Sequence, residues 1–367
     1  MNLYNYIDDY GIYSFSEKKF NDIDAVILSF LSYANFNEIF HTKSSMTIKE
    51  AGRIHIGLQK GKDRNIMAVR EANKLLRYIK DTKRYQDCKL FHYEYIGNDD
   101  IQFGAISIEF LPNRVFVSFE GTDQLFSGWK ENFMLGHKFP TLSHKEAIKY
   151  LNKHYTFTNK RLLVGGHSKG GNLALVAGMY SNLLVRMKID KVYNMDGPGL
   201  LEKEFHSKQY QKIKKKYTHI LPNYSVVGLL LNHSNDQVVS SSNKGVLAHN
   251  VVYWQIEGTH FVKTKLSTLS QELDKEINTW YSQYKEEDKE NFIINIDTVL
   301  KDANVDSILD LKEKGKNVMN VIREMKDIDE RSRKMMTQFF TIILKCIKDV
   351  KKEEFKQFMS NFLKIGG

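Results

Sequence analysis

The run L-L-V-G-G-H-S-K-G-G at residues 162–171 constrains the fold of this chain more than any other feature. An apolar run leads into a serine flanked by glycines, and a stretch rich in small residues follows. G-x-S-x-G in this setting is typical of a tight, strained strand-to-helix turn that exposes the serine Oγ above a sheet. Side chains at Gly166 and Gly170 would collide with the neighbouring strand or helix. Ser168 is therefore the predicted nucleophile.

The middle of the chain alternates between strand-like and helix-like patterns. Apolar, β-branched and aromatic runs predict strands at 91–96, 105–110, 115–119, 162–164, 192–195, 225–231 and 251–256. Helical patterns lie between them at 144–154, 170–184 and 202–217. Such alternation forms βαβ units, so we expect a mainly parallel sheet with helices on both faces. The prediction is an α/β fold of the α/β-hydrolase type, with a catalytic core over residues 91–274.

Both ends of the chain have helical patterns. Residues 1–90 are predicted to form a mostly helical segment packed on the core, with Asp22 or Asp24 as a helix cap. No proline follows Pro222, and apolar residues recur at helical spacing toward the C-terminus. Residues 275–367 are therefore predicted to be a helical C-terminal region.

The loop after an earlier strand carries a second motif. Hydrolysis of an ester or amide passes through an oxyanion, which needs prepared hydrogen-bond donors. In a fold of this type one donor is the backbone N–H after the nucleophile, here that of Lys169. The other comes from the loop after an earlier strand, and residues 115–123 form a strand pattern that runs into Gly-Thr.

This second motif supports a family resemblance. F-E-G-T at 119–122 resembles the oxyanion loop of class 3 lipases. With Y-A-N-F, G-W-K-E-N-F, G-G-H-S-K-G-G-N-L-A and N-M-D-G-P-G, it is similar to a bacterial family of lipase-like α/β-hydrolases, over roughly residues 1–265. The resemblance implies that Thr122 supplies the second oxyanion donor. The chain departs from the lipase-like loop at Glu120, where arginine is common.

The acid and base should follow the serine in the order Asp or Glu, then His. Asp236 is the predicted acid, because it follows the expected strand 225–231 and its D-Q-V resembles the lipase D-x-V segment. Asp196, in M-D-G-P-G at the end of the preceding predicted strand, is the alternative acid.

Three histidines compete for the role of base. His249, just ahead of the expected strand 251–256, fits the chain order and resembles the family position, and it is the predicted base. His233 and His260 are the alternatives. His167, which precedes Ser168 on the predicted strand-to-helix turn, is predicted to be structural.

Apolar residues between the Gly-Thr loop and Pro140 suggest where a substrate would lie. Trp129 and Phe133 are four residues apart and would share one face of a helix. Packing in the core is the commoner role for such residues. The alternative is a lid or acyl-chain cleft lined by Leu125, Phe126, Trp129 and Phe133.

Composition and missing motifs narrow the function classes. Two cysteines far apart, Cys88 and Cys346, favour a reducing compartment, and no secretion signal or membrane span is evident, so a cytoplasmic location is expected. No metal, nucleotide or dinucleotide motif is present, so we expect no cofactor and no metal. A net charge of +10 alone does not support nucleic-acid binding.

The lysines near the C-terminus suggest two roles. Lys345, Lys348, Lys351 and Lys352 are expected to lie on a solvated helix face, the alternative being peripheral contact with an anionic membrane. The sequence makes no prediction of an oligomer.

Together these features predict a serine hydrolase, a lipase or carboxylesterase acting on a small-molecule or lipid acyl ester. A thioesterase, acyltransferase or peptidase would use the same residues, and a non-catalytic interaction protein could share the fold.

Overall fold

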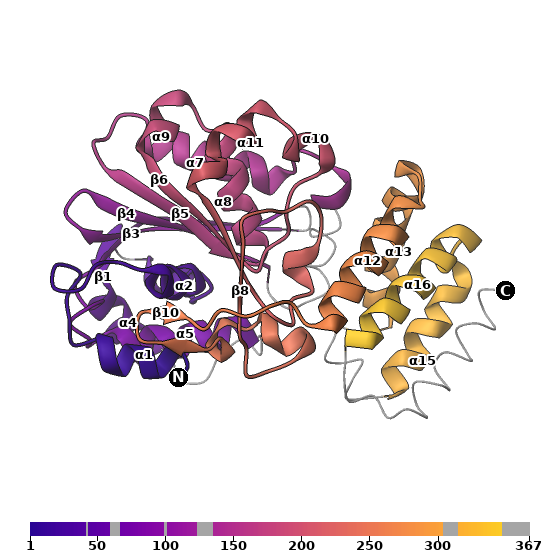
Figure 1. Ribbon diagram of the computed structural model, residues 1–367, viewed down its shortest axis with the longest axis horizontal. Coiled ribbons are helices and arrows are strands. Elements are labelled where there is room, and N and C mark those ends of the chain that lie inside the picture. The colour runs from indigo at the N-terminus through magenta and orange to yellow at the C-terminus, as the bar shows by residue number, and fades with distance from the viewer. Residues whose placement is uncertain (42, 59–66, 99–100, 123–134, 304–314, 347–367) are drawn as a thin grey trace.

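A central eight-stranded sheet organises the molecule (Figure 1). The computed structural model describes the chain except for residues 42, 59–66, 99–100, 123–134, 304–314 and 347–367. The strands follow one another across the sheet in chain order: β1 (Ser45–Thr47), β2 (Lys89–Gly97), β3 (Gln102–Leu111), β4 (Arg114–Phe119), β5 (Arg161–His167), β6 (Ile189–Met195), β7 (Tyr217–Pro222) and β8 (Asp236–Val239). Strands β1 to β4 pair antiparallel, and β4 to β8 pair parallel.

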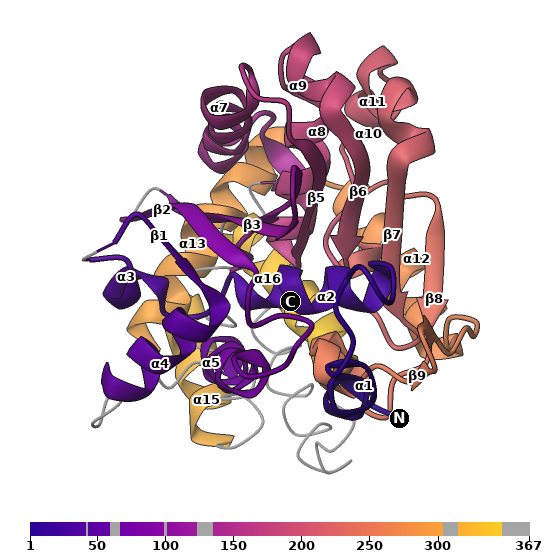
Figure 2. The same ribbon diagram turned by 90° about the vertical axis from the view of Figure 1, so that its left-hand side faces the viewer.

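Helices cover both faces of this sheet (Figure 2). One face carries α7 (Leu142–Tyr155), α8 (Lys169–Tyr180), α9 (Leu183–Lys188), α10 (Glu202–Phe205) and α11 (Lys208–Ile213), followed by the 3₁₀ turn η1 (Lys214–Lys216). The other carries α1 (Leu3–Tyr10), α2 (Asp22–Leu31), α3 (Phe36–Ile39), α4 (Ile48–Leu58) and α5 (Met67–Ile79).

Strand alternation explains how both faces are buried. In β4, Val115 and Val117 belong to the hydrophobic cluster under α7 and α8, whereas Phe116 belongs to the cluster under α2 and α5. Side chains that alternate between two covered faces give the apolar strands from which the sheet was predicted. The parallel strands with helices on both faces confirm the predicted α/β-hydrolase fold.

Two predicted strands are wrong, and the strands β1, β7 and β8 of the main sheet were not predicted. Within 225–231 the chain forms the 3₁₀ turn η2 (Val227–Leu229), and 251–256 begins with η4 (Val251–Tyr253). The strands β7 and β8 lie instead on either side of η2. An apolar run shows burial but does not separate a strand from a packed turn, which is why the assignment failed.

Short elements after β8 return the chain to the first helices. The turn η3 (Gly245–His249) precedes η4, and β9 (Ile256–Glu257) pairs antiparallel with β10 (His260–Phe261). The backbone N–H of Ile256 donates to the carbonyl of Met1 over 2.8 Å. This segment therefore packs against the N-terminal helices rather than extending the sheet.

The C-terminal helices have a hydrophobic core of their own. They are α12 (Thr268–Ser282), α13 (Glu286–Asp302), α15 (Gly315–Glu324) and α16 (Glu330–Cys346), with the 3₁₀ turn η5 (Met325–Asp327), and they lie beside the sheet (Figure 1). Their buried residues include Trp280, Phe292 and Phe339. The helical region begins at Thr268, ahead of the predicted residue 275. The structure does not describe three of the four C-terminal lysines, Lys348, Lys351 and Lys352.

No helix in the described part of the chain is both long and apolar enough to cross a bilayer.

A buried ion pair joins α2 to the loop before β2. The Arg84 guanidinium donates to both carboxylate oxygens of Asp24, over 2.7 and 2.6 Å, and both side chains are fully buried. The hydroxyl of Tyr85 donates to the same carboxylate over 2.6 Å. The helix cap is Asn21 rather than the predicted Asp22 or Asp24: its side chain accepts the N–H groups of Ile23 and Asp24, and Asp24 completes a capping box by accepting the Asn21 N–H.

Neutralising Asp24 should strongly destabilise the fold. Asp24→Asn leaves the Arg84 charge buried without a counter-ion, which typically costs about 3–5 kcal/mol. Urea denaturation would measure the change in the free energy of unfolding. The matched control is Asp81→Asn, which removes a surface partner of Lys80 and should not measurably change stability. Equal effects of the two variants would contradict the assigned role.

His92 makes the stability of the fold pH-dependent. It has φ of +52° at an irregular point of β2, and its ring stacks on that of His154 with centroids 4.0 Å apart. Burial lowers the pKa of His92 from 6.5 to about 4; His154, Lys153 and Lys160 act in the same direction and Glu94 opposes them. Above pH 6.5 the ring is neutral in both folded and unfolded chains.

As the pH falls from 6.5 toward 4, the unfolded chain takes up a proton that the folded chain resists, so stability falls. Replacement by Asn, which tolerates positive φ, should remove this contribution and flatten the decline in Tm by a few degrees. Thermal melts at pH 7, 6, 5 and 4 would measure it. His206→Asn, at an exposed histidine, is the control that should follow the wild-type slope. Identical slopes for all three proteins would contradict the assignment.

Candidate active site

Ser168 lies on a strained turn between β5 and α8. Its backbone has φ of +57° and ψ of −132°, a conformation that costs a non-glycine residue free energy and is concentrated at functional sites. Its N–H donates to the carbonyl of Met195 at the end of β6, over 2.9 Å. The side chain is 4% exposed. The nucleophile-elbow geometry expected of G-x-S-x-G is therefore present.

The two glycines of the elbow are required by close backbone contacts. A Cβ on Gly166 would lie 2.3 Å from the carbonyl carbon of Gly170. A Cβ on Gly170 would lie 2.1 Å from the carbonyl oxygen of Phe119. Such separations do not occur for real side chains, so the predicted collisions with the neighbouring strand and helix are confirmed.

His249 reaches the elbow through the turn η3. Its carbonyl oxygen lies 2.9 Å from Nε2 of His167, the residue before Ser168, and the two rings have centroids 4.4 Å apart. Its Nδ1 lies 2.7 Å from a carboxylate oxygen of Asp196. With Nδ1 bound to a carboxylate, Nε2 is the ring nitrogen on which His249 can accept a proton.

Asp196, and not Asp236, is the carboxylate that binds His249. Asp196 follows β6 directly, is fully buried and has φ of +50°. Its second oxygen accepts hydrogen bonds from the Ser225 hydroxyl over 2.5 Å and from the Gly228 N–H over 3.2 Å. The His249 ring thus binds the alternative carboxylate that M-D-G-P-G offered, and not the predicted Asp236.

Asp236 binds two other histidines. Its oxygens lie 2.8 Å from Nδ1 of His219 and 2.7 Å from Nδ1 of His233. It begins β8, whereas catalytic groups in open α/β sheets gather beyond the carboxyl ends of the strands. The prediction of Asp236 followed from the strand wrongly assigned at 225–231, which made Asp236 seem to follow a strand end.

The other histidines considered near the site, His167, His233 and His260, have other partners or lie exposed. His167 is buried between Tyr33 and His249, and its Nε2 donates to the carbonyl of His249. Burial holds its pKa well below the usual range, so it stays neutral. His233 is bound to Asp236, and His260 lies exposed on β10. His167 therefore has the structural position that was expected.

The Gly-Thr turn after β4 touches the elbow. A Cβ on Gly121 would lie 2.5 Å from the carbonyl oxygen of His167, and the next residue, Thr122, is buried. Lys169 opens α8 directly after Ser168, and its Nζ donates to the carbonyl of Gln102 over 2.6 Å. The two residues predicted as oxyanion donors thus flank the elbow, while Glu120 donates its N–H to the carbonyl of Gly104.

The residues of the alternative acyl-chain cleft are not among those that the structure describes. They are Leu125, Phe126, Trp129 and Phe133.

Comparison with known proteins gives a family and a distant structural likeness. The Mbeg1-like family model matches residues 79–297, more than half of the chain. The crystal structure of M37 lipase is similar at 18% identity and a TM-score of 0.35, covering 57% of this chain and 68% of that one. No curated protein matches. The family match accords with the lipase-like resemblance, and neither class 3 nor a bacterial origin follows from it.

Adding a methyl group at Gly170 should distort the elbow. Gly170→Ala forces Phe119 and α8 apart, and overpacking of this kind costs about 1–3 kcal/mol or more. The matched control is Gly57→Ala in α4, where a Cβ meets nothing within 4 Å. That change should stabilise the helix by about 0.5–1 kcal/mol. Chemical denaturation of both variants would measure these opposite effects, and a neutral Gly170→Ala would contradict the close contact.

Proposed function

This chain belongs to the Mbeg1-like family, and from that membership, its fold and its elbow we propose that it is a serine hydrolase of lipase or carboxylesterase type. The observation that carries the proposal is the strained Ser168 turn beside the Asp196–His249 pair. A positive φ at serine is costly unless the surrounding structure maintains it, and here β6 and the elbow glycines do so.

Each member of the proposed triad has a distinct task. His249 accepts the Ser168 proton on Nε2 as Oγ attacks the acyl carbonyl, and later returns it to the leaving alcohol. Asp196 holds the Nδ1–H tautomer and stabilises the imidazolium that forms. The buried donors Ser225 and Gly228 keep the Asp196 carboxylate oriented toward His249.

The proposed oxyanion donors are the backbone N–H groups of Lys169 and Thr122. Lys169 lies at the N-terminus of α8, where helix N–H groups and the helix dipole favour negative charge. Thr122 lies on the turn that contacts the elbow through Gly121. Water then hydrolyses the acyl-enzyme by the same sequence of proton transfers.

The proposed substrate is an acyl ester. Fold alone does not select a substrate, and the lipase-like motifs F-E-G-T and G-H-S-K-G favour ester hydrolysis over thioester or peptide cleavage.

The triad predicts a specific pattern of lost activity. Ser168→Ala should abolish hydrolysis of p-nitrophenyl esters and labelling by a fluorophosphonate probe. Asp196→Asn should lower kcat by roughly 10⁴-fold, because it favours the wrong His249 tautomer. Asp236→Asn, the same change at the carboxylate bound to other histidines, should lose far less. Assays with acyl chains from two to sixteen carbons would also define the chain-length preference.

Two results would contradict this assignment. Wild-type protein that neither hydrolyses any ester nor reacts with the probe would favour a non-catalytic role for the fold. Asp236→Asn that loses as much activity as Asp196→Asn, with both proteins folded, would return the acid to Asp236.

A further inference from the structure

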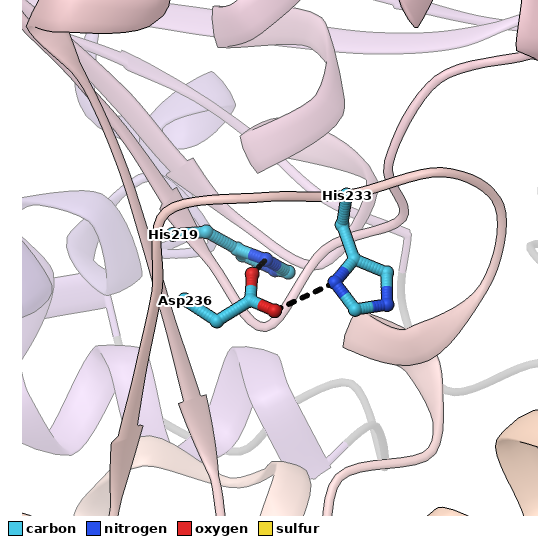
Figure 3. A group of neighbouring side chains, drawn as sticks. All are labelled: His219, His233 and Asp236. Atoms are coloured by element: carbon cyan, nitrogen blue, oxygen red, sulfur yellow. Dashed lines mark hydrogen bonds and ion pairs between the residues drawn. The ribbon is translucent and has the colours of Figure 1, made fainter.

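A second group of titratable side chains lies on β7, at the start of β8 and on the loop between them (Figure 3). His219 is on β7, Asp236 begins β8, and His233 comes from the loop between them. Figure 3 shows both imidazole rings directed at one carboxylate, each toward a different oxygen. One ligand atom from each residue lies within 4.8 Å of the other two.

The hydrogen bonds of His219 determine which of its nitrogens can bind a cation. Its Nε2 lies 3.1 Å from the carbonyl oxygen of Gly197, an acceptor only, so Nε2 carries a proton. In the neutral ring Nδ1 therefore presents a lone pair to the carboxylate of Asp236, itself an acceptor. The His219 Nδ1 and the carboxylate oxygen of Asp236, 2.8 Å apart, are therefore a pair of candidate ligand atoms.

This arrangement is the usual one for a metal-binding histidine. Such a residue donates its other ring N–H to a backbone carbonyl or carboxylate, which fixes the tautomer and aims the free nitrogen at the metal. The ring of His219 is fully buried and meets this requirement through Gly197.

The loop that carries His233 is held in place independently of the cluster. Asn235 has φ of +59°, and its side-chain amide donates to the carbonyls of Lys214 and Tyr217. The Ser234 and Tyr210 hydroxyls form a further hydrogen bond of 2.5 Å. His233 and Asp236 are therefore presented on one side of a turn that other contacts have already fixed.

A second carboxylate lies nearby on α12. Asp274 interacts electrostatically with both His233 and Asp236, and its carboxylate accepts a hydrogen bond from Asn278 over 2.7 Å. Two imidazoles with one or two carboxylates match Zn²⁺, which takes nitrogen and oxygen ligands tetrahedrally, rather than Ca²⁺ or Mg²⁺, which prefer oxygen alone.

We propose that His219, His233 and Asp236 form a zinc site. Zinc–ligand bonds of 2.0–2.2 Å place neighbouring ligand atoms about 3.3 Å apart. The two contacts of 2.7 and 2.8 Å, to different oxygens of Asp236, would open by about half an ångström, and the ligand atoms, which lie within 4.8 Å of one another, would close around the ion.

The site has a structural consequence for the turn after β6. Gly197, which accepts the His219 N–H, follows Asp196, and a Cβ on it would lie 2.0 Å from the carbonyl oxygen of Ser168. Zinc bound to His219 would restrain this turn through the hydrogen bond between His219 and Gly197. That consequence for catalysis rests on the proposed function, whereas metal binding itself does not.

The test uses the full chain without a polyhistidine tag, stripped with a chelator and then given Zn²⁺, Mg²⁺ or Ca²⁺. Elemental analysis after desalting should find about one zinc per wild-type chain. Zinc at about one hundred times Kd should raise Tm by roughly 5 °C, and Mg²⁺ or Ca²⁺ should not.

Variants distinguish the cluster from the other histidines. His233→Ala and Asp236→Asn should each lose the bound zinc and the rise in Tm. His206→Ala is the matched control, because His206 also faces a carboxylate, that of Glu202 over 2.9 Å, but on an exposed helix. It should keep both responses.

The proposal fails if the wild-type chain retains no zinc and shows no change in Tm, a measurement that needs no variant. It also fails if His206→Ala loses zinc as His233→Ala does, which would indicate adventitious binding to surface histidines. Because zinc content is read directly, these outcomes are independent of whether Ser168 hydrolyses an ester.

Discussion

The hydrogen bond from the Ser168 N–H to the carbonyl of Met195 joins the ends of two parallel strands, and the candidate active site depends on it. It fixes the elbow of β5 to the point where β6 ends, so the residue after Met195 emerges beside the serine. That residue is Asp196, whose own N–H donates to the carbonyl of Ile220 on β7. Three neighbouring strands thereby position the nucleophile and the carboxylate at one edge of the sheet.

Close backbone packing at this edge leaves little freedom for the elbow. Gly166 and Gly170 allow α8 to approach β4, and Gly197 allows the turn after β6 to approach Ser168. The strain of a serine at φ of +57° is supported by contacts on both sides of the turn. His249 is brought to the same place by its carbonyl, which binds His167, as well as by its ring.

The sequence predicted those parts of the site whose determinants are local. The elbow, its glycines and the strand before it lie within ten residues, so pattern and steric argument were sufficient. The prediction of the acid had no such local basis, because it depended on where β7 ends. The lysine-rich stretch before Tyr217 resembled a continuing helix, and the apolar run at 226–231 resembled a strand. The pairing of His219 with Asp236 joins residues on adjacent strands, which no spacing in the sequence indicates.

The histidines near the sheet edge differ in which ring nitrogen could accept a proton. His219 and His249 both place Nδ1 on a carboxylate, at 2.8 and 2.7 Å. In His219, however, Nε2 carries a proton for the carbonyl of Gly197, and Nδ1 is already engaged by the carboxylate of Asp236, so neither nitrogen is available to a nucleophile. His167 likewise donates Nε2–H to a carbonyl and is buried. His249 differs because its carboxylate fixes Nδ1–H and thereby makes Nε2 the basic atom. The choice of Asp196 as the proposed acid therefore rests on its contact with Nδ1 of His249, independently of chain order.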